Sequence, residues 1–210
     1  MRLIILVISF LSALNINAQT NGKIPVGSTK NPSANEAVAT FGEGCFWHAE
    51  IVFQSLVGVR DAVSGYAGGT DTRPNYEKVA SGKTGHAEVV QVFYDPTKIS
   101  YETLVKAFFA SQDPTTLNRQ GNDNGTEYRS VAFYRNESEK QIIESEIKRL
   151  TATKKFQNPI VTEVAAFQKF YPAEKYHQEY IYYNPDNSYV ANVSIPEFLE
   201  FKHSFKGNFK

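Results

Sequence analysis

The chain has 210 residues, of which 41% are hydrophobic and 21% charged, and its 22 basic residues balance its 22 acidic residues. This length fits one medium-sized domain with an extension, and it is sufficient to bury a hydrophobic core. Zero net charge without a long basic run argues against nucleic acid as the main partner. The single cysteine, Cys45, excludes an intramolecular disulfide, so it is either an inert core residue or a reactive thiol.

The N-terminus has the pattern of a secretion signal. Arg2 gives a positive start, residues 3–14 are almost all apolar, and Ala18 is a small residue suited to cleavage. The apolar run is shorter than the roughly 20 residues of a comfortable membrane span, which leaves a membrane anchor as the alternative. We therefore predict a signal peptide over residues 1–18 and a mature protein that is secreted or periplasmic, without membrane association after cleavage.

A polar segment over residues 19–35 predicts a flexible arm, and the folded domain is expected over residues 36–210. Apolar alternation and helical spacing predict, in chain order, strand, helix, strand, strand, helix and strand over residues 37–41, 45–58, 59–66, 86–94, 100–111 and 130–134. This βαββαβ order indicates an α/β fold of the α+β kind, a two-layer ferredoxin-like plait. A helix over residues 137–153 and a strand over residues 160–165 are expected to extend it.

Two long polar loops interrupt these elements, over residues 70–85 and 113–129. Loops longer than about 12 residues in a compact domain are usually functional. We expect both loops to lie near the N-terminus of the helix that begins at Cys45, which would place their polar side chains beside the thiol.

Cys45 follows a glycine-containing turn and begins a predicted helix. The free N–H groups and the dipole at a helix N-terminus favour an anion, so this position predicts a lowered thiol pKa. Position alone leaves the reactive and the inert interpretations about equally balanced. His48, one turn further on, is expected to face solvent, with assistance to the thiol as the alternative.

Glu88 enters a strand whose two faces are both mainly apolar. A carboxyl group buried there should have a raised pKa and could donate a proton near neutral pH, unless it turns to solvent at the strand end. Tyr76 and Tyr128 lie in or beside glycine-rich loops, where a hydroxyl can stabilise a developing oxyanion, although each alone is ordinarily a packing residue. Asp123 would by itself be a turn former.

The motif Gly44-Cys45-Phe46-Trp47 resembles that of the A-type peptide methionine sulfoxide reductases. Six further motifs agree in order and spacing, at residues 65–69, 74–76, 84–89, 113–123, 125–130 and 176–178. The resemblance extends over residues 38–205. It implies repair of oxidised proteins, by reduction of free or peptide-bound methionine S-sulfoxide.

The resemblance also implies roles for individual residues. The Cys45 thiolate would attack the sulfoxide sulfur while Glu88 protonates the oxygen, leaving methionine and a cysteine sulfenic acid. Tyr76 and Tyr128 would hydrogen-bond the same oxygen, and Asp123 would orient the site.

Substrate recognition is implied for the two aromatic residues that follow the cysteine. Phe46 and Trp47 would form an apolar pocket for the substrate methyl group. No ligand spacing indicates a metal site, and no motif indicates a bound cofactor. Oxidised proteins and a thiol reductant are the expected partners, and a monomer is the expected state.

The sequence departs from the family pattern at three places. His48 replaces a frequent glycine, Gln112 replaces a frequent histidine, and Tyr189-Val190 stands where many members have a Tyr-Cys pair. Without a resolving cysteine, the sulfenic acid must be reduced by an external thiol. The candidates are a thioredoxin-like protein, glutaredoxin with glutathione, or dithiothreitol in the laboratory.

Two other functions remain as alternatives. A hydrolase or acyl transferase with Cys45 as nucleophile would need a base, for which His48 and His177 are the candidates. An inactive module that binds oxidised proteins is the third interpretation, against which the intact Cys45 and Glu88 argue.

Overall fold

A computed structural model describes residues 31–210. The predicted signal peptide and the first part of the predicted arm therefore lie outside the described residues. Residues 31–35 are exposed, and the first strand begins at Ala37. Within the described range, no helix is long and apolar enough to cross a membrane.

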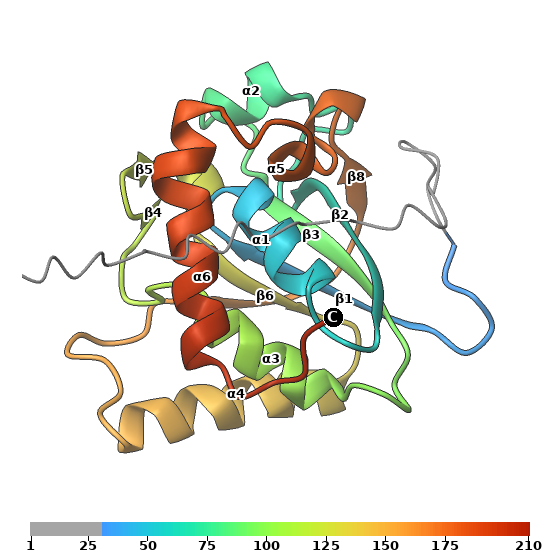
Figure 1. The fold of residues 1–210 in the computed structure, drawn as a ribbon, viewed down its shortest axis with the longest axis vertical. Coiled ribbons are helices and arrows are strands. Elements are labelled where there is room, and N and C mark those ends of the chain that lie inside the picture. Colours follow the sequence, from blue (N-terminus) through green and yellow to red (C-terminus); the bar gives the residue numbers. More distant parts are fainter. Residues whose placement is uncertain (1–30) are drawn as a thin grey trace, which may run out of the picture.

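A six-stranded mixed sheet forms the centre of the fold (Figure 1). Its strands, in spatial order, are β7 (Glu163–Ala166), β6 (Ser130–Tyr134), β1 (Ala37–Glu43), β3 (Ala87–Tyr94), β2 (Val59–Ala67) and β8 (Phe170–Pro172). The β6–β7 pair is parallel and the other four pairs are antiparallel. The four central strands thus have the order β6-β1-β3-β2.

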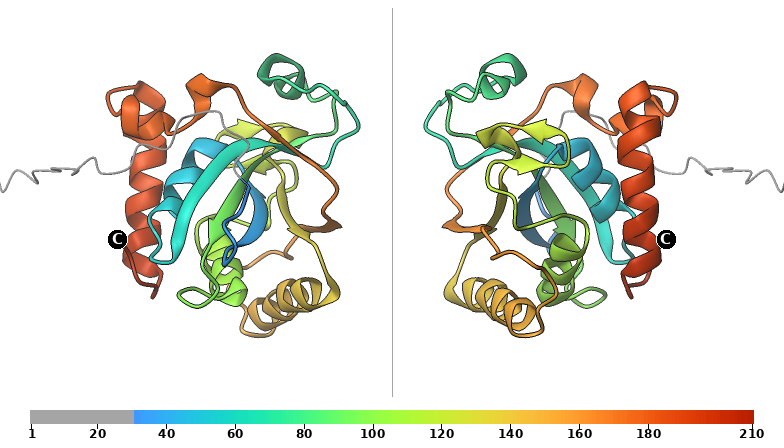
Figure 2. Two further views of the ribbon diagram at one scale, coloured as in Figure 1. Left: turned by 90° about the vertical axis from the view of Figure 1, so that its right-hand side faces the viewer. Right: turned by 90° about the vertical axis from the view of Figure 1, so that its left-hand side faces the viewer.

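Helices cover the sheet and surround its upper edge in Figure 1. They are α1 (Phe46–Gln54), α2 (Tyr76–Ala80), α3 (Tyr101–Ala110), α4 (Glu137–Ala152), α5 (Tyr180–Tyr183) and α6 (Ile195–Ser204). Figure 2 shows α1 against the sheet with α6 on its outer side, and α4 packed against α3.

The main core lies between the sheet and the α1 and α3 helices. Phe41 of β1 is fully buried and stacks on Phe53 of α1 at 5.2 Å and on Phe108 of α3 at 5.1 Å between ring centroids. Because side chains alternate along a strand, Val89 of β3 points to the opposite face, where a smaller cluster includes Val131 and Phe133. Both faces of β3 are therefore apolar, as its sequence predicts.

The predicted elements up to residue 166 are present, with small shifts at their ends. The two predicted loops contain short elements that the sequence did not indicate: α2 in the first, and β4 (Arg119–Gln120) and β5 (Asp123–Asn124) in the second. These elements are too short to give a periodic pattern in the sequence. Contacts within the loops stabilise them, and intrinsic propensity alone would not.

The helices and strands after residue 166 were not predicted from the sequence. Phe198, Phe201 and Phe205 recur at helical spacing, and this signal could have identified α6. Phe201 is 2% exposed and stacks on Phe205 at 5.1 Å. The C-terminal segment thus packs α6 against α1, the helix that carries the cysteine.

Candidate active site

Cys45 lies at the N-terminal end of α1, directly after a turn that requires glycine. Gly44 has a φ of +95°, and a Cβ at this position would lie 2.6 Å from Cβ of Gln120. The strand β1 can therefore turn into α1 only with a residue that has no side chain. The turn places the partly exposed Cys45 at the upper end of the sheet, where the two long loops meet.

The prediction of a lowered Cys45 pKa is wrong. Burial raises the pKa of the thiol well above its usual value, and the nearby Glu88 carboxyl group adds to the increase. The N–H groups of Trp47 and His48 do lower it, as expected at a helix N-terminus, but their effect is smaller. Cys45 is therefore a neutral thiol near pH 7.

The predicted burial and raised pKa of Glu88 are confirmed. Its side chain is only 2% exposed, and Oε2 accepts a hydrogen bond from the Phe46 N–H at 3.0 Å. Burial is the main reason that its pKa rises to about 8, and the charges of Asp123 and Glu127 add to the increase. Glu88 is consequently protonated at neutral pH, and it lies at the end of the cysteine helix.

A pocket of about 180 Å³ brings the predicted site residues together. It is lined by Cys45, Phe46, Trp47, Tyr76, Glu88, Asp123, Tyr128 and Tyr189. Tyr76 and Tyr128 come from the two long loops, so the prediction that both loops approach the cysteine is confirmed. Burial, followed by the Glu88 charge, raises the pKa of both tyrosines, which therefore keep their hydroxyl protons.

Aromatic contacts fix the indole of Trp47 in the pocket wall. It stacks on Tyr180 with a centroid distance of 3.7 Å and an interplanar angle of 6°. Its Nε1 donates to Nδ1 of His177 at 3.1 Å. His177 is 2% exposed, and burial lowers its pKa to about 4, so it stays a neutral acceptor. The sequence suggested His177 only as a candidate base for a cysteine hydrolase and as part of the motif at residues 176–178.

Tyr189 is the pocket residue to which the sequence analysis gave no role. Its hydroxyl donates to Oδ2 of Asp123, and its ring meets Trp47 edge to face. The sequence contained a signal, because Tyr189 belongs to the pair that matches the Tyr-Cys of other family members. Asp123 is thus held by the C-terminal segment and is not only a turn former.

The expectation that His48 faces solvent is also wrong. His48 is 5% exposed, its Nε2 contacts the Ser111 carbonyl at 3.2 Å, and Nδ1 lies 3.9 Å from Glu197. Burial lowers its pKa, so the ring is neutral. Gln112 follows Ser111 directly, so two of the three departures from the family pattern lie at the same place, behind α1.

Among residues 31–210, no group of three or more His, Cys, Asp or Glu side chains is arranged to hold a metal ion. The pocket itself contains a thiol, a protonated carboxyl group and the hydroxyl groups of Tyr76 and Tyr128. Such a set can protonate and hydrogen-bond a small polar oxygen while a sulfur nucleophile attacks the atom that carries it.

Sequence comparison identifies relatives along most of the chain. A family model described as "Peptide methionine sulfoxide reductase" matches residues 37–208. A peptide methionine sulfoxide reductase MsrA from Nautilia profundicola is 48% identical over 171 residues, which are 80% of this chain and 97% of the relative. Another from Trichodesmium erythraeum is 50% identical over 159 residues, or 76% and 89% of the two chains.

Solved structures show the same similarity. Reduced Mxr1 from Saccharomyces cerevisiae has a TM-score of 0.68 and 34% identity, covering 75% of this chain and 91% of Mxr1. Methionine sulfoxide reductase A of Corynebacterium diphtheriae has a TM-score of 0.67 and 34% identity, covering 73% and 77%. The chain therefore belongs to the peptide methionine sulfoxide reductase family.

Proposed function

We propose that this enzyme reduces the S epimer of methionine sulfoxide, free or in oxidised proteins, through a sulfenic acid on Cys45. The observation that carries the proposal is the single pocket containing a thiol, a protonated carboxyl group and two hydroxyl donors. As a member of its family, the protein is an oxidoreductase that acts on sulfur and repairs oxidised methionine.

The first half-reaction combines these groups. The Cys45 sulfur forms a bond to the sulfoxide sulfur while Glu88 transfers its proton to the oxygen, so the S–O bond loses its double-bond character, and the proton released by the Cys45 thiol returns Glu88 to its acid form. Tyr76 and Tyr128 donate hydrogen bonds to that oxygen as its negative charge develops. The oxygen then passes to Cys45, methionine leaves, and Cys45 is oxidised to the sulfenic acid.

Two further interactions set the position of the substrate. Phe46 and Trp47 receive the methyl group on the apolar side of the pocket, where Tyr180 and His177 hold the indole. Asp123, held by Tyr189, orients the polar part of the substrate.

The second half-reaction requires an external thiol, because the chain has no other cysteine. One thiol displaces water from the sulfenic acid to form a mixed disulfide, and a second releases Cys45 and leaves as a disulfide. Mxr1 has been crystallised in complex with Trx2, with a TM-score of 0.50 and 26% identity to this chain. That complex supports a thioredoxin-like reductant, while glutaredoxin with glutathione remains the second candidate.

The two histidines argue against a hydrolase or acyl transferase. Nε2 of His48 is directed to the Ser111 carbonyl, and Nδ1 of His177 accepts from Trp47. Neither ring lines the pocket, and burial lowers the pKa of both. A cysteine hydrolase needs a base within hydrogen-bond reach of its nucleophile, and the acid Glu88 does not replace one.

Three wider properties are proposed with the activity. The order β6-β1-β3-β2, with α1 and α3 on one face, supports a ferredoxin-like plait, which an experimental structure with another strand order would contradict.

The apolar segment over residues 3–14 supports export, and N-terminal sequencing of the mature protein should then begin at Gln19. A monomer is expected, which light scattering of the purified mature protein would check.

The activity is tested with the separated S and R epimers of a blocked methionine sulfoxide and excess dithiothreitol. The S epimer should be reduced and the R epimer should remain, because only one epimer can direct its oxygen to Glu88 while its methyl group lies against Trp47. Equal turnover of both epimers would contradict the proposed stereospecificity. No turnover of either would contradict the reductase function itself.

A further inference from the structure

Tyr76 lies in a part of the chain that has little stability of its own. The segment between β2 and β3 leaves the sheet and contains only the five-residue helix α2, of which Tyr76 is the first residue. So short a helix is not stable by itself, because it makes too few hydrogen bonds to offset the cost of starting it. The position of the Tyr76 hydroxyl therefore depends on what connects α2 to the rest of the molecule.

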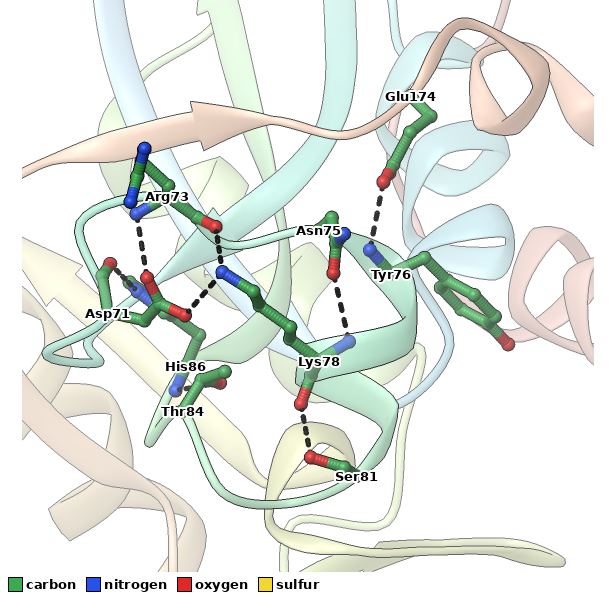
Figure 3. A network of polar contacts seen from close by, with 9 residues as sticks. All are labelled: Asp71, Arg73, Asn75, Tyr76, Lys78, Ser81, Thr84, His86 and Glu174. Atoms are coloured by element: carbon green, nitrogen blue, oxygen red, sulfur yellow. Dashed lines mark hydrogen bonds and ion pairs between the residues drawn. The ribbon is translucent and has the colours of Figure 1, made fainter.

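Most polar contacts of this segment close it on itself (Figure 3). Lys78 Nζ donates to Asp71 Oδ2 at 3.2 Å and to the Arg73 carbonyl at 2.8 Å. Nε2 of the buried His86 contacts the Asp71 carbonyl at 2.8 Å. These bonds give the loop its shape, but Tyr76 takes part in none of them.

Glu174 supplies the connection. Its Oε1 accepts a hydrogen bond from the Tyr76 N–H at 2.9 Å, and its Oε2 accepts one from the Tyr66 hydroxyl at 2.9 Å. Figure 3 shows Glu174 reaching Tyr76 from outside the loop, while the Tyr76 ring points away from the Asp71 and Lys78 contacts. This carboxylate thus joins α2 to the sheet by hydrogen bonds, in addition to the packing of Val79 in the main core and of the Tyr76 ring on His177 at 4.5 Å.

The sheet end of this connection lies beside the proton donor. Tyr66 is fully buried in β2, and its register partner across the antiparallel ladder is Glu88 of β3. The Glu174 carboxylate therefore connects the backbone of Tyr76 to Tyr66, the residue that lies opposite Glu88 in the sheet. Glu88 and the backbone of Tyr76 are thus both fixed to the same pair of strands, β2 and β3.

The backbone around Glu174 is itself fixed to β2. The Ala173 N–H donates to the Ser64 carbonyl at 2.9 Å, and Nε2 of Gln178 donates to the same carbonyl at 2.9 Å. Ser64 N–H returns a bond to Oε1 of Gln178 at 3.1 Å. Burial opposes the charge on Glu174, but the hydrogen bonds from the Tyr76 N–H, from its own backbone N–H and from the Tyr66 hydroxyl together outweigh burial and lower the pKa of Glu174. The anion thus has two donors and an anchored backbone.

We propose that Glu174 is a positioning residue of the sulfoxide reduction, which holds the Tyr76 hydroxyl at a fixed place relative to Glu88 through its bonds to Tyr76 and Tyr66. The inference rests on the proposed role of Tyr76 as a donor to the sulfoxide oxygen. Glu174 does not line the pocket, so its effect on the reaction must pass through the residue that it holds.

The test measures the methionine formed in a single turnover, without reductant, at saturating substrate. Glu174→Ala should slow this step by about 10-fold to 100-fold, because a displacement of about 1 Å in a catalytic group has effects of this size. Glu174→Gln keeps the length and an acceptor for the Tyr76 N–H, and it should restore the rate to within about threefold of wild type. Glu77→Ala is the matched control, because it removes an exposed carboxylate next to Tyr76 that makes no hydrogen bond to it.

The decisive comparison repeats Glu174→Ala in a Tyr76→Phe background. If Glu174 acts through the Tyr76 hydroxyl, the second substitution should change the rate by less than about twofold. An equal loss in both backgrounds, or no loss in either, would overturn the inference. If Tyr76→Phe alone is as fast as wild type, the proposed role of Tyr76 fails and the inference fails with it, while S-epimer turnover still tests the function separately.

A second readout does not depend on activity. Hydrogen exchange of the Tyr76 amide should become faster in Glu174→Ala and stay unchanged in Glu77→Ala, since only the first variant loses the acceptor of that N–H. Unchanged exchange in Glu174→Ala would overturn the inference. A cooperative thermal transition in Glu174→Ala would show that this variant loses the position of Tyr76 and keeps the fold.

Discussion

At the scale of single residues, the site is defined by two groups whose pKa values are both raised by burial. Glu88 gains a pKa of about 8 and keeps its proton, whereas Cys45 is left as a neutral thiol although it lies at a helix N-terminus. The same low-polarity surroundings therefore prepare the acid and restrain the nucleophile. A resting thiol of this kind is protected from oxidants, because only the thiolate reacts readily.

Substitution of Glu88 tests the acid directly. Glu88→Gln keeps the size of the side chain and an acceptor for the Phe46 N–H, but it cannot give a proton to the sulfoxide. The single-turnover rate should fall by about 10²-fold to 10⁴-fold, the usual contribution of a general acid. A rate equal to wild type would show that another group donates the proton.

The pH dependence provides the control for this prediction. A donor must be protonated, so the wild-type rate should decrease as pH rises through about 8, the pKa of Glu88. This decrease should be absent in Glu88→Gln. A limb that rises with pH would instead report ionisation of Cys45.

At the scale of elements, the junction between β1 and α1 determines where the thiol lies. Gly44 makes this turn with a positive φ, and Gln120 from the second long loop packs against it. Gln120 Oε1 also accepts from the Asp113 N–H at 3.3 Å, so the same side chain orders the loop that carries Asp123. The turn and the loop are therefore coupled by one contact.

Gly44→Ala should destabilise the fold and displace Cys45. A strained backbone residue costs about 1–3 kcal/mol, and the added methyl group would also collide with Gln120. Gly85→Ala is the matched control. Gly85 also has a positive φ of +72°, but a Cβ added there would lie no closer than 3.4 Å to any neighbouring atom. Urea unfolding should show a larger loss for Gly44→Ala than for Gly85→Ala, and equal losses would mean that the contact with Gln120 is not restrictive.

At the scale of the whole molecule, the notable feature is that the chain contains very few sulfur atoms. The only methionine is Met1 and the only cysteine is Cys45, so residues 2–210 contain a single sulfur. The fold is therefore stabilised without a disulfide, by the aromatic core between the sheet and its helices. The enzyme also contains no internal methionine that could become its own substrate.

This composition predicts a reaction that stops after one turnover. Without reductant, the protein should form about one methionine per chain, and dimedone should then label Cys45 by mass spectrometry, because the sulfenic acid has no internal thiol to meet. Added dithiothreitol should restore continuous turnover. More than one methionine per chain without reductant would contradict the proposed cycle, and Cys45→Ser provides the unreactive control.

The sequence by itself determined what depends on local pattern. Alternation in β1 and β3 and helical spacing in α1 and α3 predicted these elements, and seven short motifs in the same order and spacing predicted the family. The burial of Glu88 was also predictable, because both faces of its strand are apolar. Each of these features is encoded within about ten neighbouring residues.

Only the tertiary structure decided what depends on contacts between distant segments. The raised pKa of Cys45 follows from burial and from Glu88, which reaches α1 across a separation of 42 residues in the chain. The burial of His48 depends on Ser111, and the connection of Tyr76 to the sheet depends on Glu174, 98 residues away. Desolvation and hydrogen bonding depend on which segments meet in space, and local periodicity does not contain that information.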